Sequence, residues 1–162
     1  MVAPGFAGSI SWADPANMAN SAKGKITFTS TAGVVVLDVK YAYLVKGPDA
    51  ISARPARRIV LTTTDTSAKI AACKSMLSCP GGGFDSGMTI DFELGPRINF
   101  WLVGNRQHIQ YSGGAKPGTF TLTTDTPRRL AGTWRLDERA YDGALIDVEF
   151  HATLSKEIPA SK

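Results

Sequence analysis

The sequence predicts an all-β domain, namely an antiparallel two-sheet sandwich of about nine strands with one short helix. Apolar and polar residues alternate with period two along most of the chain, which is the pattern of half-buried strands. The segments are joined mainly by short turns, and short turns favour antiparallel neighbours. A single helix cannot cover both faces of a parallel sheet. A closed, lipocalin-like β-barrel is the alternative architecture.

The first strands precede the helix. Residues 26–29 alternate between apolar side chains and threonine. In residues 35–45 every second residue is apolar, and these apolar side chains are expected to share one face. The sequence at 46–49, Lys-Gly-Pro-Asp, is typical of a turn. Residues 58–63 are rich in β-branched side chains and predict a third strand.

One helix is expected from Thr66 to Leu77. Asp65 or Thr66 can cap its start, because a side-chain oxygen there satisfies a free backbone N–H. Ile70, Cys73 and Leu77 recur at helical spacing and predict its buried face.

The rest of the chain returns to the strand pattern. Six further strands are predicted at 90–94, 98–102, 109–111, 120–122, 130–136 and 144–154. Trp134 lies on an inward-facing row, so we expect it in the core. Trp101 alternates with Ile98, Phe100 and Leu102, so it faces outward if those three face inward. It is therefore the candidate for an aromatic contact at the surface.

The length of 162 residues suits one domain. We expect a single β domain over residues 23–158. Gly, Ala, Ser, Asn and Pro dominate residues 1–22, which predicts a loosely ordered N-terminal segment, and residues 159–162 are expected to form a tail.

The net charge of +4 is a mild excess, with 18 basic and 14 acidic side chains. A nucleic-acid-binding protein concentrates such an excess on one face or helix. The basic residues here form small groups, such as Arg54, Arg57 and Arg58, which we interpret as solvated loops and strand ends or as an anion-binding patch. We expect no nucleic-acid partner. The longest apolar stretch is too short and too polar to predict a transmembrane segment.

The two cysteines, Cys73 and Cys79, do not have the spacing of a zinc site. Two interpretations stay open. A local disulfide would place the protein in an oxidising compartment, whereas the alternative is a pair of free, buried thiols. We favour the disulfide.

Signatures of catalysis and cofactor binding are not found in the sequence, so we expect no catalytic residue, no cofactor and no enzymatic activity. Asp147, Glu149 and His151 alternate on one face of the last strand, and carboxylate and imidazole groups suit a divalent metal. These three residues can equally form the solvent-exposed face of an amphipathic strand, and we favour that interpretation.

Several segments resemble known families. Gly132-Thr-Trp134 resembles the G-x-W motif of lipocalins, which carry it on their first strand, whereas here it lies on the penultimate one. A broader resemblance is to small exported bacterial domains of unknown function. It is carried by Gly24-Lys-Ile-Thr-Phe28, Val39-Lys-Tyr-Ala-Tyr43, Arg58-Ile-Val-Leu-Thr62, Leu130-Ala-Gly-Thr-Trp134 and Ile146-Asp-Val-Glu-Phe150.

The broader resemblance implies an envelope location and a non-enzymatic role. We therefore expect a periplasmic or secreted module that binds an unidentified protein or small ligand. A carrier with a barrel pocket for a small apolar ligand is the second hypothesis, and a hydrolase is the third.

Overall fold

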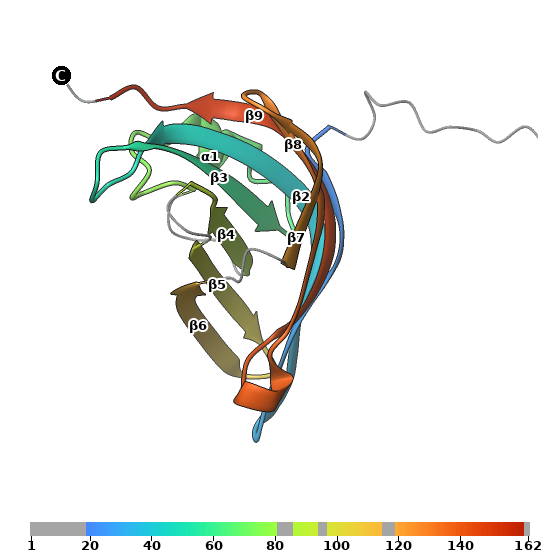
Figure 1. Cartoon of the computed structure of the whole chain (residues 1–162). Helices are drawn as coiled ribbons and strands as arrows, with labels where there is room; N and C mark the ends of the chain where they lie inside the picture. Colours follow the sequence, from blue (N-terminus) through green and yellow to red (C-terminus); the bar gives the residue numbers. More distant parts are fainter. Residues whose placement is uncertain (1–18, 81–85, 94–96, 115–118, 161–162) are drawn as a thin grey trace, which may run out of the picture.

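Strands dominate the computed structural model, which describes residues 19–80, 86–93, 97–114 and 119–160 (Figure 1). The nine strands confirm the all-β prediction. The elements follow in the order β1 (Ser21–Ser30), β2 (Gly33–Pro48), β3 (Pro55–Thr62), α1 (Ser67–Ala71), β4 (Gly87–Asp91), β5 (Arg97–Gly104), β6 (Gln107–Gly114), β7 (Phe120–Thr126), β8 (Arg129–Asp137), the 3-10 turn η3 (Arg139–Tyr141) and β9 (Leu145–Glu157).

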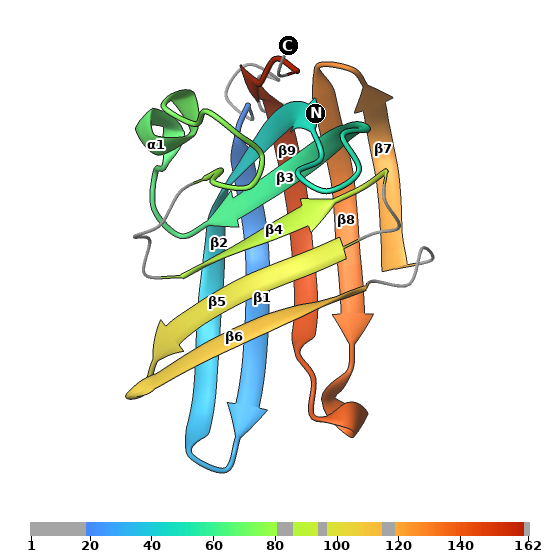
Figure 2. The same cartoon turned by 90° about the vertical axis from the view of Figure 1, so that its left-hand side faces the viewer.

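The nine strands form one sheet in the order β6-β5-β4-β3-β2-β1-β9-β8-β7. Every neighbouring pair in this order is antiparallel, and a short parallel pairing also joins β2 to β9. The antiparallel prediction is therefore confirmed. The two-sheet sandwich is not confirmed, because the described strands make one open sheet with β6 and β7 at its edges. The sheet folds over itself instead (Figures 1 and 2).

The fold-over depends on β2, which is 16 residues long and changes partners along its length. Its first half pairs with β1, and from Tyr41 onward it pairs with β3. A strand that bends between two partners lets the two halves of a sheet cross at a large angle. Figure 2 shows β3, β4, β5 and β6 running obliquely across β1, β2, β9 and β8.

A bulge in β1 assists this curvature. The register of β1 against β2 shifts between Ser21 and Gly24, and Gly24 has a φ of +130°. A side chain at Gly24 would collide with the backbone of Asp147 on β9. Glycine is needed here because both the positive φ and the close approach exclude a β-carbon.

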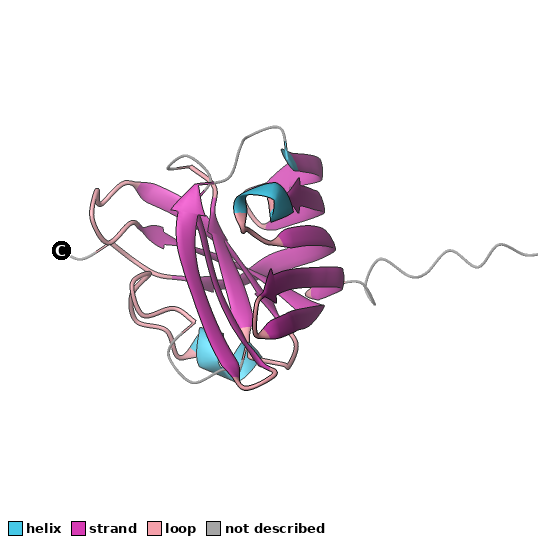
Figure 3. Cartoon of the chain, turned by 90° about the horizontal axis from the view of Figure 1, so that it is seen from below, coloured by secondary structure: helices cyan, strands magenta, loops and turns pink. Residues whose placement is uncertain are grey.

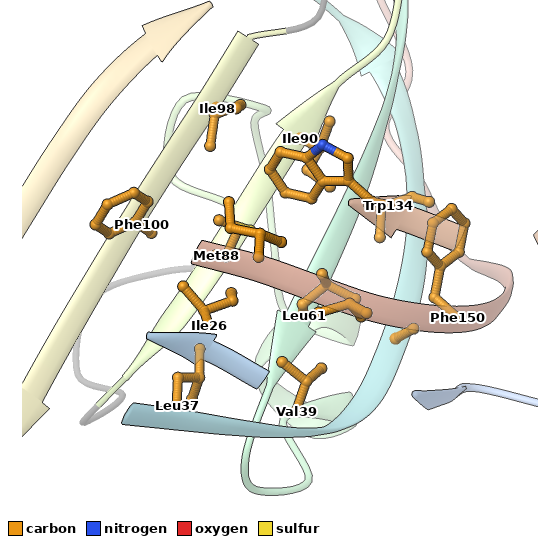
Figure 4. Close-up of a cluster of buried hydrophobic side chains, with 14 of the residues drawn as sticks. Ile26, Leu37, Val39, Leu61, Met88, Ile90, Ile98, Phe100, Trp134 and Phe150 are labelled. Carbon is orange, nitrogen blue, oxygen red and sulfur yellow. The ribbon is translucent and has the colours of Figure 1, made fainter. Parts of the chain in front are cut away.

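The main core fills the space between the two halves of the sheet, which face each other when seen from below (Figure 3). The inward row of β5, Ile98, Phe100 and Leu102, is buried as the alternation predicts. Trp134 and Phe150 enter from the opposite half (Figure 4). Burying each such side chain contributes about 1.5–3 kcal/mol, so this row-against-row contact is a major source of stability.

A smaller apolar cluster covers the outer face of β2 and β3, on the side away from the main core. It lies under α1 and the segment that follows. Its members are Tyr43, Val45, Ala56, Val60, Ile70, Cys73, Met76, Cys79 and Ile158. The cluster attaches α1 to the sheet and so positions the segment that follows α1 up to Cys79.

The predicted helix over Thr66 to Leu77 is too long, because α1 ends at Ala71. Cys73 and Cys79 are six residues apart in the chain, and their Cα atoms are 5.3 Å apart. A straight helix would separate them by about 9 Å, so the chain must leave the helix before Cys79. In consequence Met76 is buried in place of Leu77, which is 81% exposed.

The start of α1 uses Asp65 rather than Thr66. The Asp65 Oδ1 atom accepts a hydrogen bond of 2.9 Å from the backbone N–H of Ser67. The Thr66 hydroxyl makes no capping hydrogen bond. Of the two predicted caps, the aspartate therefore performs the function.

The Sγ atoms of Cys73 and Cys79 lie 2.17 Å apart, at disulfide distance. Because the closed loop is short, the chain-entropy treatment gives a contribution of about 2 kcal/mol to stability. We expect the double variant Cys73→Ala/Cys79→Ala to lose about that much unfolding free energy. Urea unfolding measures it, with Ser75→Ala in the same loop as the control.

Thiol titration of the denatured, unreduced protein provides a direct check on the pair. The expected result is no free sulfhydryl. Two free thiols after purification under oxidising conditions would contradict the bond.

Tyr43 joins the smaller cluster to the start of α1. Its hydroxyl donates to Asp65 Oδ1 at 2.9 Å and accepts from the backbone N–H of Thr66 at 3.1 Å. Burial, with a further contribution from Asp65, raises the pKa of Tyr43 from 10.0 to about 12. The protonated phenol is thus favoured in the folded state.

This pKa shift predicts an alkaline loss of stability. Below pH 10 the phenol is protonated in both states, and its contribution is fully present. Between about pH 10 and about pH 12 only the unfolded chain releases the proton, so the unfolding free energy falls by about 2–3 kcal/mol. Chemical unfolding across this range measures the fall, and Tyr43→Phe is expected to remove that part of it. An identical pH dependence in both proteins would contradict the assignment.

The expected domain limits fall close to the ends of the described chain. Residues 1–18 of the expected N-terminal segment lie outside the described residues, and β1 begins at Ser21. Ile158 is buried, whereas Pro159 and Ala160 are exposed. Within the described ranges, no helix has the length and hydropathy needed to cross a membrane.

Candidate functional site

The outer face of β3, β4, β5 and β6 carries a groove of about 650 Å³. This face is turned toward the viewer in Figure 2. The turn between β2 and β3 forms one wall, and residues 77–80 after α1 form another. Ile51 and Leu77 expose 88% and 81% of their surface on these walls. The volume lies in the range of pockets that hold small ligands.

The floor of the groove is set by the strand register. Asp91 on β4 lies opposite both Arg58 on β3 and Arg97 on β5. Residues directly opposite one another in neighbouring strands point to the same face of the sheet. The register therefore brings these three charged side chains into one row.

Asp91 is the centre of this row. Arg58 binds it through Nε–Oδ1 at 2.6 Å and Nη2–Oδ2 at 3.0 Å, and Arg97 Nη2 lies 3.0 Å from Oδ2. The Asp91 side chain is only 2% exposed. A carboxylate this deeply buried is compatible with folding because both of its oxygens accept charge-assisted hydrogen bonds.

The same row fixes both walls. Arg58 Nη1 donates to the carbonyl oxygens of Met76 and Cys79, the latter at 2.8 Å. Arg97 Nη2 donates to Asp49 Oδ1 at 2.8 Å, in the turn between β2 and β3. The row therefore ties the disulfide-linked segment and the turn to the sheet.

Asp49 is locked in its charged form. Its Oδ2 accepts hydrogen bonds from the backbone N–H groups of Ser52 and Ile51 and from the Ser52 hydroxyl. The Ser52 N–H and the Arg97 guanidinium hold the pKa of the Asp49 carboxyl well below its usual range. In return, Asp49 and then Asp91 raise the pKa of Arg97. The groove floor thus contains two carboxylates and two guanidinium groups that neutralise one another.

A second row lies beside the ionic one. Thr89 on β4 lies opposite Asn99 on β5, which lies opposite Ser112 on β6. Asn99 Oδ1 accepts a hydrogen bond of 2.6 Å from the Ser112 hydroxyl. Thr89 is only 3% exposed and lines the groove.

Three polar groups of the floor have no hydrogen-bond partner among the described residues. They are Thr89 Oγ1, Asn99 Nδ2 and Arg97 Nη1. None of these atoms is among the buried side-chain atoms that lack a partner, so they face the open groove and are free to bind a ligand there.

The structure places Trp101 in the lining of this groove, two residues beyond Asn99 on the same face of β5. It is partly buried. His108 on β6 lines the groove as well and is exposed. Of the residues singled out from the sequence, four thus line one groove, namely Arg58, Leu77, Cys79 and Trp101.

The Asp147, Glu149 and His151 row lies elsewhere, on β9. Asp147 pairs with Arg135 at 3.0 Å, and Glu149 lies 3.4 Å from His151 Nε2. Both carboxylates are more than half exposed. No group of three or more potential metal ligands occurs among the described residues.

The basic group around Arg57 divides between the two faces of β3. Arg57 pairs with Glu93 and with Asp125, the latter at 2.6 Å, and these residues line a second hollow of about 620 Å³. Arg58 points into the groove and is only 12% exposed. The interpretation of this group as solvated side chains is therefore wrong for Arg58.

The pairing of the charged row, and the places of Thr89 and Asn99 beside it, are not evident from the sequence pattern. One signal was available, because Arg97, Asn99 and Trp101 alternate with the inward row of β5. Their partners on β3 and β4 require the strand order, which the alternation does not contain.

The comparisons with known proteins do not extend this description. No protein family model, curated protein or solved structure matches the chain. The resemblance to exported bacterial domains therefore depends on the sequence motifs quoted above.

Proposed function

We propose that this protein is a non-enzymatic binding module of the bacterial envelope and that its ligand occupies the groove on β3–β6. The observation that carries the proposal is the combination of a fixed floor with unpartnered polar groups. The Asp49–Arg97–Asp91–Arg58 chain holds the floor in place, and Thr89, a largely buried residue beside it, has a hydroxyl that makes no hydrogen bond to the described residues. Pre-organisation of this kind favours binding because little ordering is needed when the ligand enters.

Binding is favoured over hydrolysis by the state of the groove carboxylates. A general acid or base must exchange a proton with the substrate. The oxygens of Asp49 and Asp91 are instead engaged by guanidinium groups and backbone N–H groups. These carboxylates act as structural anchors for the groove.

A carrier for an apolar ligand requires an internal hollow. In this fold the space between the two halves of the sheet is occupied by large side chains, including Trp134 and Phe150, which are fully buried. The outer groove is therefore the better candidate for a ligand site.

The envelope location is supported by the cysteines. Cys73 and Cys79 lie at disulfide distance, and such pairs persist in oxidising compartments such as the periplasm or the extracellular space. The sequence resemblance to exported domains supports the same location.

A thermal-shift screen tests the proposed site. The probes are a library of oligosaccharides, short peptides and small organic acids, applied to the wild type, to Trp101→Ala and to Val103→Ala. Val103 is the matched control, because it lies on the same strand and face but outside the groove lining. A ligand at ten times its Kd is expected to raise the Tm of the wild type and Val103→Ala by about 3–6 °C, and that of Trp101→Ala by less. Hits that stabilise all three proteins equally would place the binding site outside the groove.

A further inference from the structure

We infer that the ligand of the β3–β6 groove is a neutral saccharide. This inference rests on the proposed function and names the chemical class of its ligand. Charge balance, the unpartnered polar groups and the spacing along β5 support it independently.

The charge balance favours a neutral ligand. Each carboxylate of the floor is paired with a guanidinium group, and each guanidinium is paired with a carboxylate. An anion entering the groove would find no unpaired cation in this row, and a cation would find no unpaired carboxylate. Removing such a charged ligand from water would be costly without compensation.

The unpartnered groups favour a ligand rich in oxygen acceptors. Arg97 Nη1 and Asn99 Nδ2 can only donate, and the Thr89 hydroxyl can donate or accept. A peptide would bring backbone N–H donors, yet the carboxylate oxygens of this floor are already engaged. Sugar hydroxyls can turn to accept from the floor, and they can therefore satisfy all three groups.

The geometry of β5 suits a ring-shaped ligand. Arg97, Asn99 and Trp101 occupy alternate positions on one face, so neighbouring side chains stand about 7 Å apart. Thr89 lies across from Asn99 at about 5 Å between β-carbons. A sugar ring over Asn99 can reach Thr89 with one hydroxyl, and Trp101 lies next along the strand in the groove lining.

The sharpest test uses Thr89→Val, which removes the hydroxyl and keeps the shape. Because this hydroxyl lacks a described partner, the variant is expected to unfold at the same urea concentration as the wild type or a higher one. The probes are matched neutral and uronic-acid oligosaccharides, screened on an array with the full chain and followed by calorimetric titration. We expect neutral oligosaccharides to bind the wild type, and Thr89→Val to bind them about tenfold more weakly.

Asn99→Ala is expected to show a similar loss, and Gln110→Ala is its control. Gln110 is exposed on the neighbouring strand β6 and does not line the groove. Raising NaCl from about 0.05 M to about 0.5 M is expected to leave the affinity unchanged, because no net charge is paired on binding.

The outcomes separate the inference from the function on which it rests. Binding of only acidic oligosaccharides, or only peptides, that is lost in Thr89→Val would overturn the neutral saccharide and keep the groove as a binding site. Saccharide binding that is unchanged in Thr89→Val and Asn99→Ala would show that the groove is not the binding site. If no neutral oligosaccharide on the array binds the protein, the inference is overturned. The wider library of the thermal-shift screen still tests the proposed function in that case.

Discussion

Replacing Asp91 with alanine is expected to lower the unfolding free energy by about 3–5 kcal/mol, because it leaves a buried guanidinium without its partner. Arg58 is 12% exposed and makes two hydrogen bonds to this carboxylate. Arg97 loses a partner at the same time, although it keeps Asp49. Urea unfolding measures the loss through the midpoint and slope of the transition.

Asp147→Ala is the matched control for this substitution. Asp147 forms an ion pair of 3.0 Å with Arg135, but both side chains are about two-thirds exposed. Exposed pairs of this kind contribute about 0–1 kcal/mol. Equal losses in the two variants would show that the burial of Asp91 has no energetic consequence.

Trp134→Ala is expected to cost a similar amount, about 3–5 kcal/mol, through a different mechanism. The indole is fully buried in the main core and stacks on Phe120 with ring centroids 4.8 Å apart. Its Nε1 donates a hydrogen bond of 3.1 Å to the Thr119 hydroxyl. Truncation removes a large buried surface and leaves a cavity between the two halves of the sheet.

The control for Trp134 is Tyr141→Ala, since Tyr141 is 86% exposed in η3. We expect that substitution to change stability by less than about 0.5 kcal/mol. Thermal unfolding monitored by circular dichroism compares the two. A cost at Trp134 as small as the one at Tyr141 would contradict the packing of the two halves described above.

Alternation was sufficient to predict most of the strands, because burial of one face imposes the same period on each of them. The strand predicted at 90–94 is an exception, since β4 lies at Gly87–Asp91. In β5 the three inward side chains are buried as expected, and β9 extends over the predicted last strand. The curvature of the sheet could not be predicted in this way. Residues 33–48 read as one strand, and nothing in their alternation shows that the two halves of β2 bind different partners.

The candidate site was less accessible to sequence reasoning for a similar reason. Arg58 and Asp91 are adjacent only through the pairing of β3 with β4, and a shift of one residue would point one of them into the core. The distance between Cys73 and Cys79 is too short for one continuous helix through both residues. The helical spacing of Ile70, Cys73 and Leu77 does not reveal this limit. Trp101 could be identified because the alternation within its own strand is enough to place its side chain on the outward face.

The position of β9 within the sheet has a consequence for how the chain folds. This last strand lies between β1 and β8 and also touches β2, so Ser21 near the start of the described chain pairs with His151 near its end. Contacts of such long sequence separation make folding slow, on the scale of milliseconds to seconds for all-β domains. During synthesis, β1 and β2 can form a hairpin but find no closing partner until the residues of β9 have been made. The sheet therefore cannot be completed before the residues of β9 have been made.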